Sequence, residues 1–377
     1  MDTPLRPGAQ PEPLVSILMP VYQEERFIRS VFEDLLGQTH RNIEILVCDN
    51  CSPDATFEIA QEFARRDPRV KAHRHATNIG AVANFVAALE LARGEFVMMA
   101  AGHDHHLPTY VEACVAELQQ DPAVVMAYTK ADFMDVAGKV IGRAPTDIDT
   151  RGMAPASRVN AVLWGVEYPY QMYGVFRKSL YAGWTFKAVL VPDILFLVHC
   201  ALQGTFAQVP QALLLMRQNS DYGDAAAYAK KIYTHGTGLT AGSHPDRLYY
   251  EMLREYVRVI KNSHPPGTNR NSLVASVVLA MAVRHHCQLD FGRRVAGLPG
   301  APARSDLQSA VDRFAGEFES MLLTRDNVEE SLHQKAREDV LKQFATDELV
   351  SLMTYRELLR GVLHRIQNTV RRHFSGS

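Results

Sequence analysis

Short apolar runs alternate with segments of helical periodicity over the first hundred residues of this chain. Four runs are short and apolar and end at polar or turn-forming residues, and we predict a strand in each: residues 15–19, 43–48, 70–75 and 95–100. Between them, apolar residues recur at helical spacing in residues 26–36, 54–66 and 80–93. Strands that alternate with helices of this length are typical of βαβ units. The sequence therefore predicts an α/β fold with a mainly parallel sheet.

The composition is that of an ordinary globular protein. The chain has 377 residues, of which 47% are hydrophobic and 22% are charged, and this length allows two domains. The formal net charge is −2. Because bulk binding to nucleic-acid phosphates needs a concentrated basic surface, we expect no nucleic-acid partner.

Membrane signals and cysteines favour a cytoplasmic protein. No apolar run reaches the roughly 18 residues that a membrane-spanning helix needs. Residues 1–13 are rich in proline and lack the apolar core of a signal peptide, so we interpret them as a flexible lead-in. The five cysteines are few, odd in number and mostly set in apolar surroundings. This pattern fits a reducing compartment, and we expect a cytoplasmic location.

The periodicity changes once along the chain. After the fourth predicted strand we expect a helix at residues 108–120 and two further strands at 124–127 and 131–136. From residue 225 onward the spacing of apolar residues is mostly helical. We therefore predict an α/β domain over residues 14–224 and an appended all-helical domain over residues 225–377.

Polar residues directly follow the predicted strands. Tyr22 and Glu24 come after the first strand, Asp49 follows the second, and Asn78 and Gly80 follow the third. In open α/β sheets, ligands bind in the crevice beyond the carboxyl ends of the strands, so we expect these residues to share one site. Gly80 would let the backbone approach a ligand closely. Structural roles stay open, since Asp49 could cap the following turn and Asn78 the following helix.

Four groups of residues make this region resemble the family 2 inverting glycosyltransferases of the GT-A fold. In chain order they are Ser16–Tyr22, then Gln38–Thr39 with Glu44–Asn50, then Asn78–Gly80 with Asn84, and finally Ala92–Val97. The resemblance continues more loosely through Tyr173–Arg177 and Pro192–Asp193 to Arg217. The rest of the chain lies outside it.

This resemblance implies a nucleotide-diphosphate sugar as donor, UDP- or dTDP-linked. The acceptor would be a hydroxyl group of a carbohydrate, of a lipid-linked molecule or of another glycoconjugate. Asp49 would accept a hydrogen bond from an N–H group of the base. The turn after the first strand would give the base an apolar or aromatic wall and a polar edge, through Pro20, Val21, Tyr22 and Glu24.

The metal site is where this chain departs from the family pattern. Relatives carry an Asp-x-Asp after the fourth strand, often followed by another Asp. Here the first two positions fall on Ala101 and His103, and only Asp104 is acidic. Three explanations stay open. His103 and Asp104 hold a divalent metal, for which a nitrogen ligand favours Mn²⁺ over Mg²⁺; cationic side chains hold the phosphates without a metal; or the site has decayed, which would leave a nucleotide-binding or assembly module.

Inverting transfer also needs a carboxylate base to take the proton of the acceptor hydroxyl, and such a base typically contributes about 10²–10⁴-fold. Asp193 resembles the family's Asp near the start of a helix, with a plain N-cap role as the alternative. Arg217 matches an arginine that the family places near the diphosphate, where a guanidinium offers a fixed fork of donors. A surface ion pair is the alternative for Arg217.

Two regions could serve the acceptor or a partner. Trp164, Tyr168 and Trp184 are candidates for stacking on a sugar, and equally for the core. Near the C-terminus, apolar residues between Leu359 and Phe374 form a helical stripe among several arginines. Such a helix can lie on an anionic membrane, or it can dock on its own domain or on a second subunit. We therefore keep open a homo-oligomer and a peripheral contact with the inner face of a membrane.

Overall fold

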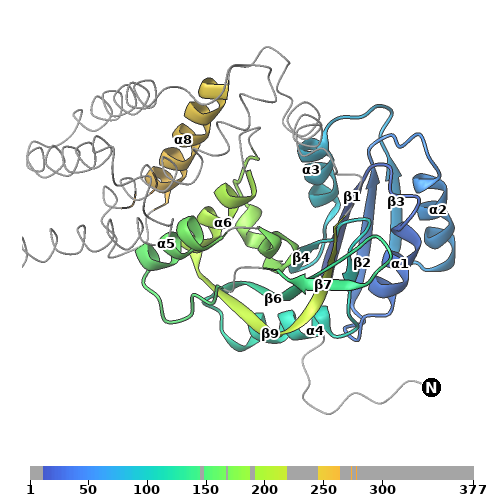
Figure 1. Cartoon of the computed structure of the whole chain (residues 1–377), viewed down its shortest axis with the longest axis horizontal. Helices are drawn as coiled ribbons and strands as arrows, with labels where there is room; N and C mark the ends of the chain where they lie inside the picture. The colour runs from blue at the N-terminus through green and yellow to red at the C-terminus, as the bar shows by residue number, and fades with distance from the viewer. Residues whose placement is uncertain are drawn as a thin grey trace, which may run out of the picture. The chain divides into compact units, whose positions relative to one another are not determined.

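The computed structural model describes residues 12–144, 148–166, 169–186, 192–218 and 245–263, together with Leu273 and Val277. Its strands form one nine-stranded sheet with helices around it (Figure 1). The strands are β1 (Val15–Val21), β2 (Ile43–Asp49), β3 (Val70–Arg74), β4 (Phe96–Met99), β5 (His105–His106), β6 (Val124–Met134), β7 (Val140–Arg143), β8 (Val175–Arg177) and β9 (Thr205–Arg217). The α-helices are α1 (Ile28–Leu36), α2 (Thr56–Arg66), α3 (Ala81–Leu91), α4 (Tyr110–Gln120), α5 (Pro155–Gly165), α6 (Pro192–Gln203) and α8 (Pro245–Asn262), and two 3₁₀ helices are η1 (Tyr170–Tyr173) and η2 (Lys178–Tyr181).

One half of the sheet is built from the βαβ units that the sequence predicts. Strands β3, β2, β1 and β4 are neighbours in that order, and all of them pair in parallel. Right-handed crossovers place α1 and α2 on one face of these strands and α3 on the other (Figure 1). The direction of progression reverses between β1 and β4. Ligands bind at such a switch point in sheets of this kind.

The other half of the sheet mixes parallel and antiparallel pairs. Strand β8 is antiparallel to β4 and β6, β5 is antiparallel to β9, and β6 runs parallel to β9. The prediction of two strands between residues 124 and 136 is wrong, because β6 is continuous and turns back into β7. The β6–β9 pairing shifts register on both sides of Lys130. The irregularity lies between residues 127 and 131, where the first expected strand ends and the second begins.

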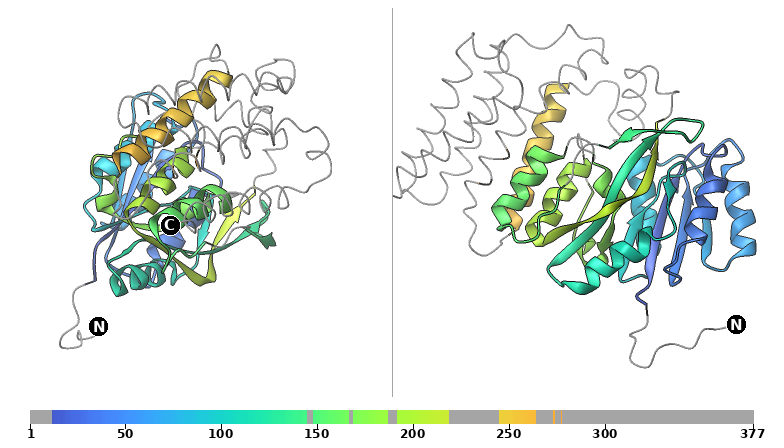
Figure 2. Two further views of the ribbon diagram at one scale, coloured as in Figure 1. Left: turned by 90° about the vertical axis from the view of Figure 1, so that its left-hand side faces the viewer. Right: turned by 60° about the horizontal axis from the view of Figure 1, so that its bottom comes forward.

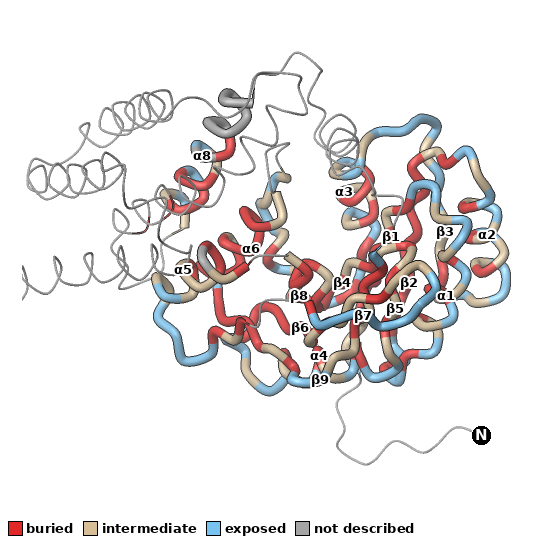
Figure 3. The backbone as a smooth tube through the Cα atoms, viewed as in Figure 1, coloured by how far each residue is buried: buried red, intermediate tan, exposed pale blue. Residues whose placement is uncertain are grey.

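The central strands carry the core. Every residue of β2 is buried, and β1 is buried except at Pro20. Burial on both faces explains why these strands are continuous apolar runs rather than alternating ones. Figure 3 shows buried residues along the central strands, whereas β7 is exposed along its whole length. Helices α1 and α2 pack together through Phe32 and Phe63, whose rings stack with centroids 4.5 Å apart.

An aromatic cluster joins α3 to α6 on the same side of the sheet. Phe85 of α3 lies 5.1 Å from Phe186, and Phe186 lies 5.4 Å from Phe196 of α6, measured between ring centroids. Tyr181 stacks on Phe196 at 4.8 Å. Figure 2 shows these helices from two further sides. The two halves of the sheet are thus held together by ring packing in addition to the β4–β8 pairing.

Part of the predicted helical region is described. Helix α8 contacts α6, and its buried residues include Met252, Val257, Val259 and Ile260. The domain boundary expected near residue 225 and the basic stripe near the C-terminus lie outside the described residues, and so do Tyr168 and most of the lead-in. Among the described residues, no helix combines the length and hydropathy that crossing a bilayer requires.

Candidate functional site

The loops that follow β1 and β2 are tied to each other at the carboxyl edge of the sheet. The Gln23 backbone N–H donates to Ser52 Oγ at 3.0 Å, and the Glu24 N–H donates to Thr56 Oγ1 at 2.8 Å. Gln23 and Cys51 both have positive φ angles, 60° and 61°, although neither is glycine. Such conformations cost free energy and persist where surrounding contacts fix them, often at functional sites.

Asp49 is the most constrained carboxylate of this edge. Its side chain is completely buried. Asp49 Oδ2 accepts a hydrogen bond from the Ser52 backbone at 3.0 Å and lies 3.3 Å from Nε of Arg74. Asp49 Oδ1 is buried and has no hydrogen-bond partner in the described part of the chain. A buried acceptor without a donor is costly, so this oxygen is suited to an N–H group supplied by a ligand.

The loop after β3 is held against the loop after β2 by two asparagines. Asn50 Nδ2 donates to Asn78 Oδ1 at 2.9 Å, and Asn50 Oδ1 accepts the Ile79 N–H at 2.8 Å. Asn78 Oδ1 also accepts the Gly80 N–H. Gly80 has a φ of 86°, which favours glycine. The Asn78 side-chain oxygen therefore fixes the loop. Glycine is favoured at position 80 because the backbone there has a positive φ angle.

Two exposed apolar side chains lie on the loops next to the one that follows Asp49. Tyr22 follows β1 and is 36% exposed, and Ile79 follows β3 and is 41% exposed. Strand β2, which ends at Asp49, lies between β1 and β3 in the sheet. Tyr22 was predicted from the sequence and Ile79 was not. Ile79 lies between Asn78 and Gly80, which the sequence indicated as site residues. Only the exposure of its side chain in the structure makes Ile79 a candidate.

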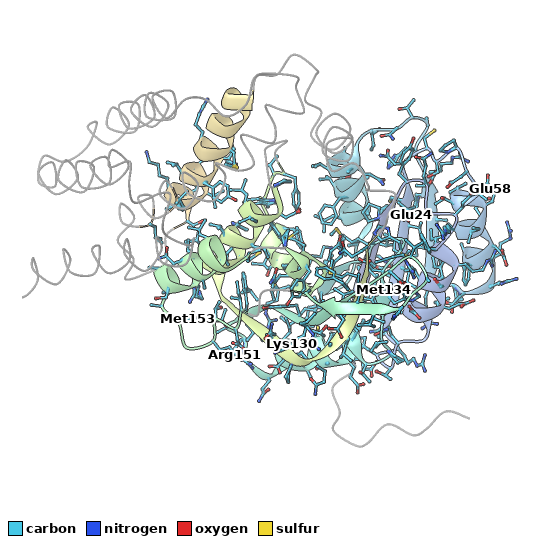
Figure 4. All side chains as sticks on the ribbon, in the orientation of Figure 1. Glu24, Glu58, Lys130, Met134, Arg151 and Met153 are labelled. Atoms are coloured by element: carbon cyan, nitrogen blue, oxygen red, sulfur yellow. The ribbon has the colours of Figure 1, made fainter. Side chains whose placement is uncertain are left out.

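His103 and Asp104 lie across the switch point, in the loop between β4 and β5. His103 Nδ1 is 2.9 Å from Oε1 of Glu24, which lies at the carboxyl end of β1 (Figure 4). His103 Nε2 is 3.9 Å from Oδ1 of Asp104. Gly102 is required there, because a Cβ atom at this position would come 2.6 Å from Cγ of Glu24. Glu24, expected at the edge of a base, is therefore a partner of His103.

Charge is balanced within this cluster. Burial alone would lower the pKa of His103, but the hydrogen bond with Glu24 and the charge of Asp104 raise it above its usual value. Burial raises the pKa of Asp104, against the charge of His103 and the hydrogen bond from the Arg217 backbone. The two carboxylates beside His103 thus favour the protonated form of its ring.

The donor set fits a metal ion only with help from a ligand. No group of three or more His, Cys, Asp or Glu side chains that could hold a metal occurs among the described residues. Two metal–ligand bonds of about 2.1 Å span up to roughly 4.2 Å, so one ion could reach both His103 Nε2 and Asp104 Oδ1 at their separation of 3.9 Å. The remaining ligands would have to come from the substrate or from water.

Arg217, which the resemblance places near the diphosphate, lies beside Asp104, and its guanidinium faces the protein. The Arg217 backbone N–H donates to Asp104 Oδ1 at 2.8 Å. Its side chain donates to the carbonyl oxygens of His103, Asp135 and Val136 and to His105 Nε2. The guanidinium also stacks on the ring of Phe27 at 4.4 Å. Arg217 therefore holds the His103–Asp104 loop in this structure, and its fork of donors is occupied.

The two remaining histidines of the run are structural. His105 Nδ1 lies 2.5 Å from Oδ2 of Asp34, while His105 Nε2 accepts from Arg217, so the ring is the Nδ1–H tautomer. His106 is buried, and neither ring nitrogen has a hydrogen-bond partner in the described part of the chain. Burial lowers the pKa of His106 to about 4, so this ring is neutral.

Asp193 is placed at the same edge by the topology. Helix α6 ends at Gln203, and β9 follows at Thr205, which is in register with Val124 at the start of β6. The C-terminal end of α6 therefore lies at the amino edge of β6 and β9, and its N-terminal end, with Asp193, lies toward the carboxyl edge. The Asp193 carboxylate has no hydrogen bond or ion pair with the described residues, and burial raises its pKa to about 6.

The aromatic acceptor candidates are only partly described. Trp184 belongs to the aromatic cluster, with its ring centroid 4.4 Å from that of His199 and 5.4 Å from that of Phe196. This packing favours the core role. The side chain of Trp164 and the whole of Tyr168 lie outside the described residues.

The supporting residues Ser52 and Arg74 were missed by the sequence analysis. Ser52 is buried, its N–H and hydroxyl contact Asp49 and the Gln23 backbone, and its carbonyl oxygen accepts from Arg74. A serine after a strand-end Asp is a common turn signal, which pointed to a turn rather than to a site. Arg74 lies on the edge strand β3, and no sequence motif indicated a role for it.

Comparisons with known proteins agree with this architecture. A family model described as Glycosyl transferase family 2 matches residues 16–180. An uncharacterized glycosyltransferase of Haemophilus influenzae is 31% identical over 210 residues, which cover 56% of this chain and 78% of that protein. The putative glycosyltransferase EpsH of Bacillus subtilis is 37% identical over 197 residues, covering 45% of this chain and 57% of EpsH.

Solved structures show the same fold. The crystal structure of Staphylococcus aureus TarS 1–349 superposes with a TM-score of 0.53 at 18% identity, covering 74% of this chain and 73% of that chain. Its complex with UDP-GlcNAc gives a TM-score of 0.56 at 16% identity, covering 74% and 77%. The expected GT-A fold is thereby confirmed. Some relatives are much longer: this chain spans 19% of a chondroitin synthase of Escherichia coli, to which it is 33% identical over 130 residues.

Proposed function

Since this chain belongs to glycosyltransferase family 2, we propose that it transfers a sugar from a nucleotide-diphosphate sugar to a hydroxyl acceptor with inversion at the anomeric carbon. The donor is UDP- or dTDP-linked, and the acceptor belongs to a glycan, a glycolipid or another glycoconjugate. The observation that carries this proposal is the buried Asp49 Oδ1 at the carboxyl end of β2, an acceptor that receives no hydrogen bond from the described residues.

Recognition of the base follows from the surroundings of Asp49. A uracil or thymine ring presents an N–H between two carbonyl groups, and that N–H is the donor that Asp49 Oδ1 lacks. Tyr22 and Ile79 would cover the two faces of the ring, since both are exposed and lie on the loops that follow β1 and β3, the two neighbours of β2. Pro20 and Val21 support Tyr22 from the end of β1. TarS has been solved in complex with UDP and with UDP-GlcNAc, which supports a uridine donor.

The diphosphate would bind at the switch point, beside His103 and Asp104. A divalent cation held there, Mn²⁺ rather than Mg²⁺, would neutralise the charge that develops on the leaving diphosphate. Gly80 and the N-terminal end of α3 lie at the same edge. Arg217 takes part through the loop that it holds, because its guanidinium donors are occupied by protein acceptors.

Asp193 would supply the base. Its carboxylate takes the proton of the acceptor hydroxyl while that oxygen attacks the anomeric carbon, and the bond between this carbon and the phosphate oxygen breaks. The electron pair leaves with the nucleoside diphosphate. A pKa of about 6 leaves Asp193 mostly ionised at neutral pH yet more basic than an ordinary Asp.

A non-catalytic nucleotide-binding or assembly module is the second candidate, and the absence of the usual Asp at positions 101 and 103 favours it. The two functions differ in turnover rather than in binding. Both predict that UDP binds, whereas only the enzyme hydrolyses or transfers the sugar of its donor.

A panel of nucleotide sugars tests the proposal. The full chain is heated with each compound in the presence of Mn²⁺, since a donor at 100 times its Kd stabilises the fold by about 2.7 kcal/mol. UDP- or dTDP-linked sugars should raise the Tm, and the best of them should be consumed in a coupled assay for released nucleoside diphosphate. Stabilisation without release would favour the non-catalytic module. No stabilisation by any nucleotide would contradict both.

The cellular setting of this reaction is also a proposal. We infer a cytoplasmic enzyme, because nucleotide sugars and reduced cysteines share that compartment, and the four cysteines of the described chain are free thiols. Contact with a membrane through the C-terminal stripe would bring the enzyme to a lipid-linked acceptor. Contact with a second subunit through the same stripe would make a homo-oligomer.

A further inference from the structure

Glu24 is fixed by contacts of both its backbone and its side chain. Its N–H donates to Thr56, and its carbonyl oxygen accepts the N–H groups of Phe27 and Ile28 at the start of α1. Its side chain lies over Gly102, which has no Cβ to displace it. The backbone and the side chain of Glu24 are thus both fixed before any ligand binds.

The contact with Glu24 decides what His103 can do. A carboxylate accepts hydrogen bonds only, so at 2.9 Å from Glu24 the Nδ1 atom of His103 carries a proton. The other nitrogen, Nε2, is turned toward Asp104. The side chains of His103 and Glu24 are 20% and 18% exposed, so a ligand can reach the ring. In metal sites, a carboxylate on one imidazole nitrogen commonly orients the other nitrogen toward the ion.

Resting on the proposed function, we propose that Glu24 is a positioning residue that presents His103 Nε2, together with Asp104, to the divalent cation of the donor diphosphate. The nitrogen ligand replaces a carboxylate of the family pattern, and it gives this site a preference for Mn²⁺ over Mg²⁺ because imidazole suits the later metal better. Two protein ligands make a weak site alone, in keeping with the lack of a three-residue metal group in the described chain. The ion and the nucleotide should therefore bind together.

Pulsed electron paramagnetic resonance of Mn²⁺ bound to the full chain with UDP tests this assignment directly. The spectrum should contain a nitrogen-14 coupling from an imidazole ligand, and His103→Asp should remove it. His103→Asp should also shift the ratio of the two dissociation constants toward Mg²⁺. Both measurements are independent of turnover.

The role of Glu24 is tested by the dissociation constant of Mn²⁺ in the presence of UDP. Glu24→Ala should raise it by roughly 10- to 100-fold, and Glu24→Gln, which keeps an acceptor oxygen near Nδ1, should bind Mn²⁺ more tightly than Glu24→Ala. Glu33→Gln, an exposed carboxylate of α1, is the matched control and should not change the constant. A circular dichroism spectrum like that of the parent in each variant shows that the fold is intact.

The outcomes separate this inference from the proposed function. A bound Mn²⁺ without nitrogen coupling, or a Glu24→Ala variant that binds Mn²⁺ like the parent, would overturn the inference while UDP binding kept the proposed function standing. If the parent chain bound neither UDP nor uridine, the proposed function would fail and this inference with it.

Discussion

At the scale of single residues, Asp193 is a carboxylate that has no hydrogen bond or ion pair with the described residues. Its pKa is raised to about 6 by burial alone. A general base acts in its ionised form. The rate of transfer at low substrate concentration should therefore rise with pH up to about 6 and level off above it. A profile that stays flat between pH 5 and 7 would argue against Asp193 as the base.

Asp193→Asn separates the functional role from a structural one. Transfer should fall by about 10²–10⁴-fold while UDP still binds. Because the folded pKa lies above the unfolded one, ionisation of Asp193 disfavours the fold, and stability declines as pH rises from about 4 toward 6. The variant lacks this loss, so its Tm at pH 7.5 should equal or exceed that of the parent. A marked fall in Tm would instead indicate a helix cap.

Ile79 is the residue whose role rests on exposure alone. Covering its side chain with a nucleotide base removes apolar surface from water, so Ile79→Ala should raise the Kd of UDP by roughly 5- to 10-fold. Leu91→Ala is the matched control, since Leu91 is 38% exposed at the opposite end of α3. Fluorescence or calorimetric titration gives both constants. Equal constants for the two variants would remove Ile79 from the site.

His106 shows how a site motif can contain a residue with no part in the site. Its ring packs edge-on against Tyr110 with centroids 5.0 Å apart, and both ring nitrogens are buried without partners in the described chain. Buried unsatisfied polar groups cost about 1–3 kcal/mol each. His106→Leu should therefore raise the Tm, measured by calorimetry, with UDP affinity unchanged. A lower Tm would mean that the ring contributes more by packing than its nitrogens cost.

At the scale of elements, the sequence predicted the strands and helices whose residues form a local pattern. The four parallel strands and their helices were found because apolar runs and helical spacing are local signals. The short strands β5 and β8 were missed, since runs of two or three residues carry no periodicity. For the site, the strand-end position of Asp49 could be predicted, but the inward direction of the Arg217 guanidinium could not. That direction depends on Phe27, Asp135 and Val136, which are distant in the sequence.

One cluster around the buried Glu44 ties the elements of the parallel half together at the amino edge. Glu44 of β2 accepts hydrogen bonds from Ser16 of β1, from Lys71 of β3 and from Arg93, which follows α3. Burial alone would raise the pKa of Glu44, but these contacts, that of Arg93 above all, lower it to about 2. The cluster therefore stabilises the fold only while Glu44 is ionised.

Glu44→Gln should destabilise the chain by on the order of 1 kcal/mol at pH 7, because the side chains of Arg93 and Lys71 are 66% and 38% exposed and solvent screens their charges. The folded pKa lies below the unfolded one, so the stabilisation is present above about pH 4.5 and is lost as the pH falls toward 2. Urea unfolding of parent and variant should thus converge at low pH. Glu90→Gln, an exposed residue of α3, is the control. A constant difference between parent and Glu44→Gln over this range would contradict the assignment.

At the scale of the whole molecule, residues from three strand ends converge on one proposed site. Asp49, Glu24 and His103 come from three different strand ends, and a chain of hydrogen bonds through Ser52 and the backbone of residues 23–24 connects them. Parallel pairing of β2, β1 and β4 brings those ends to one edge, and the aromatic cluster fixes α6 beside it.

Calorimetric titration of the full chain with UDP and Mn²⁺ tests this convergence most directly. We expect one site per chain, at least tenfold weaker binding of UDP by Asp49→Asn, and weaker binding when Mn²⁺ is withheld. Asp67→Asn, a carboxylate at the opposite edge of the sheet after α2, should bind UDP like the parent. Absence of binding, or equal affinities of Asp49→Asn and the parent, would contradict the account.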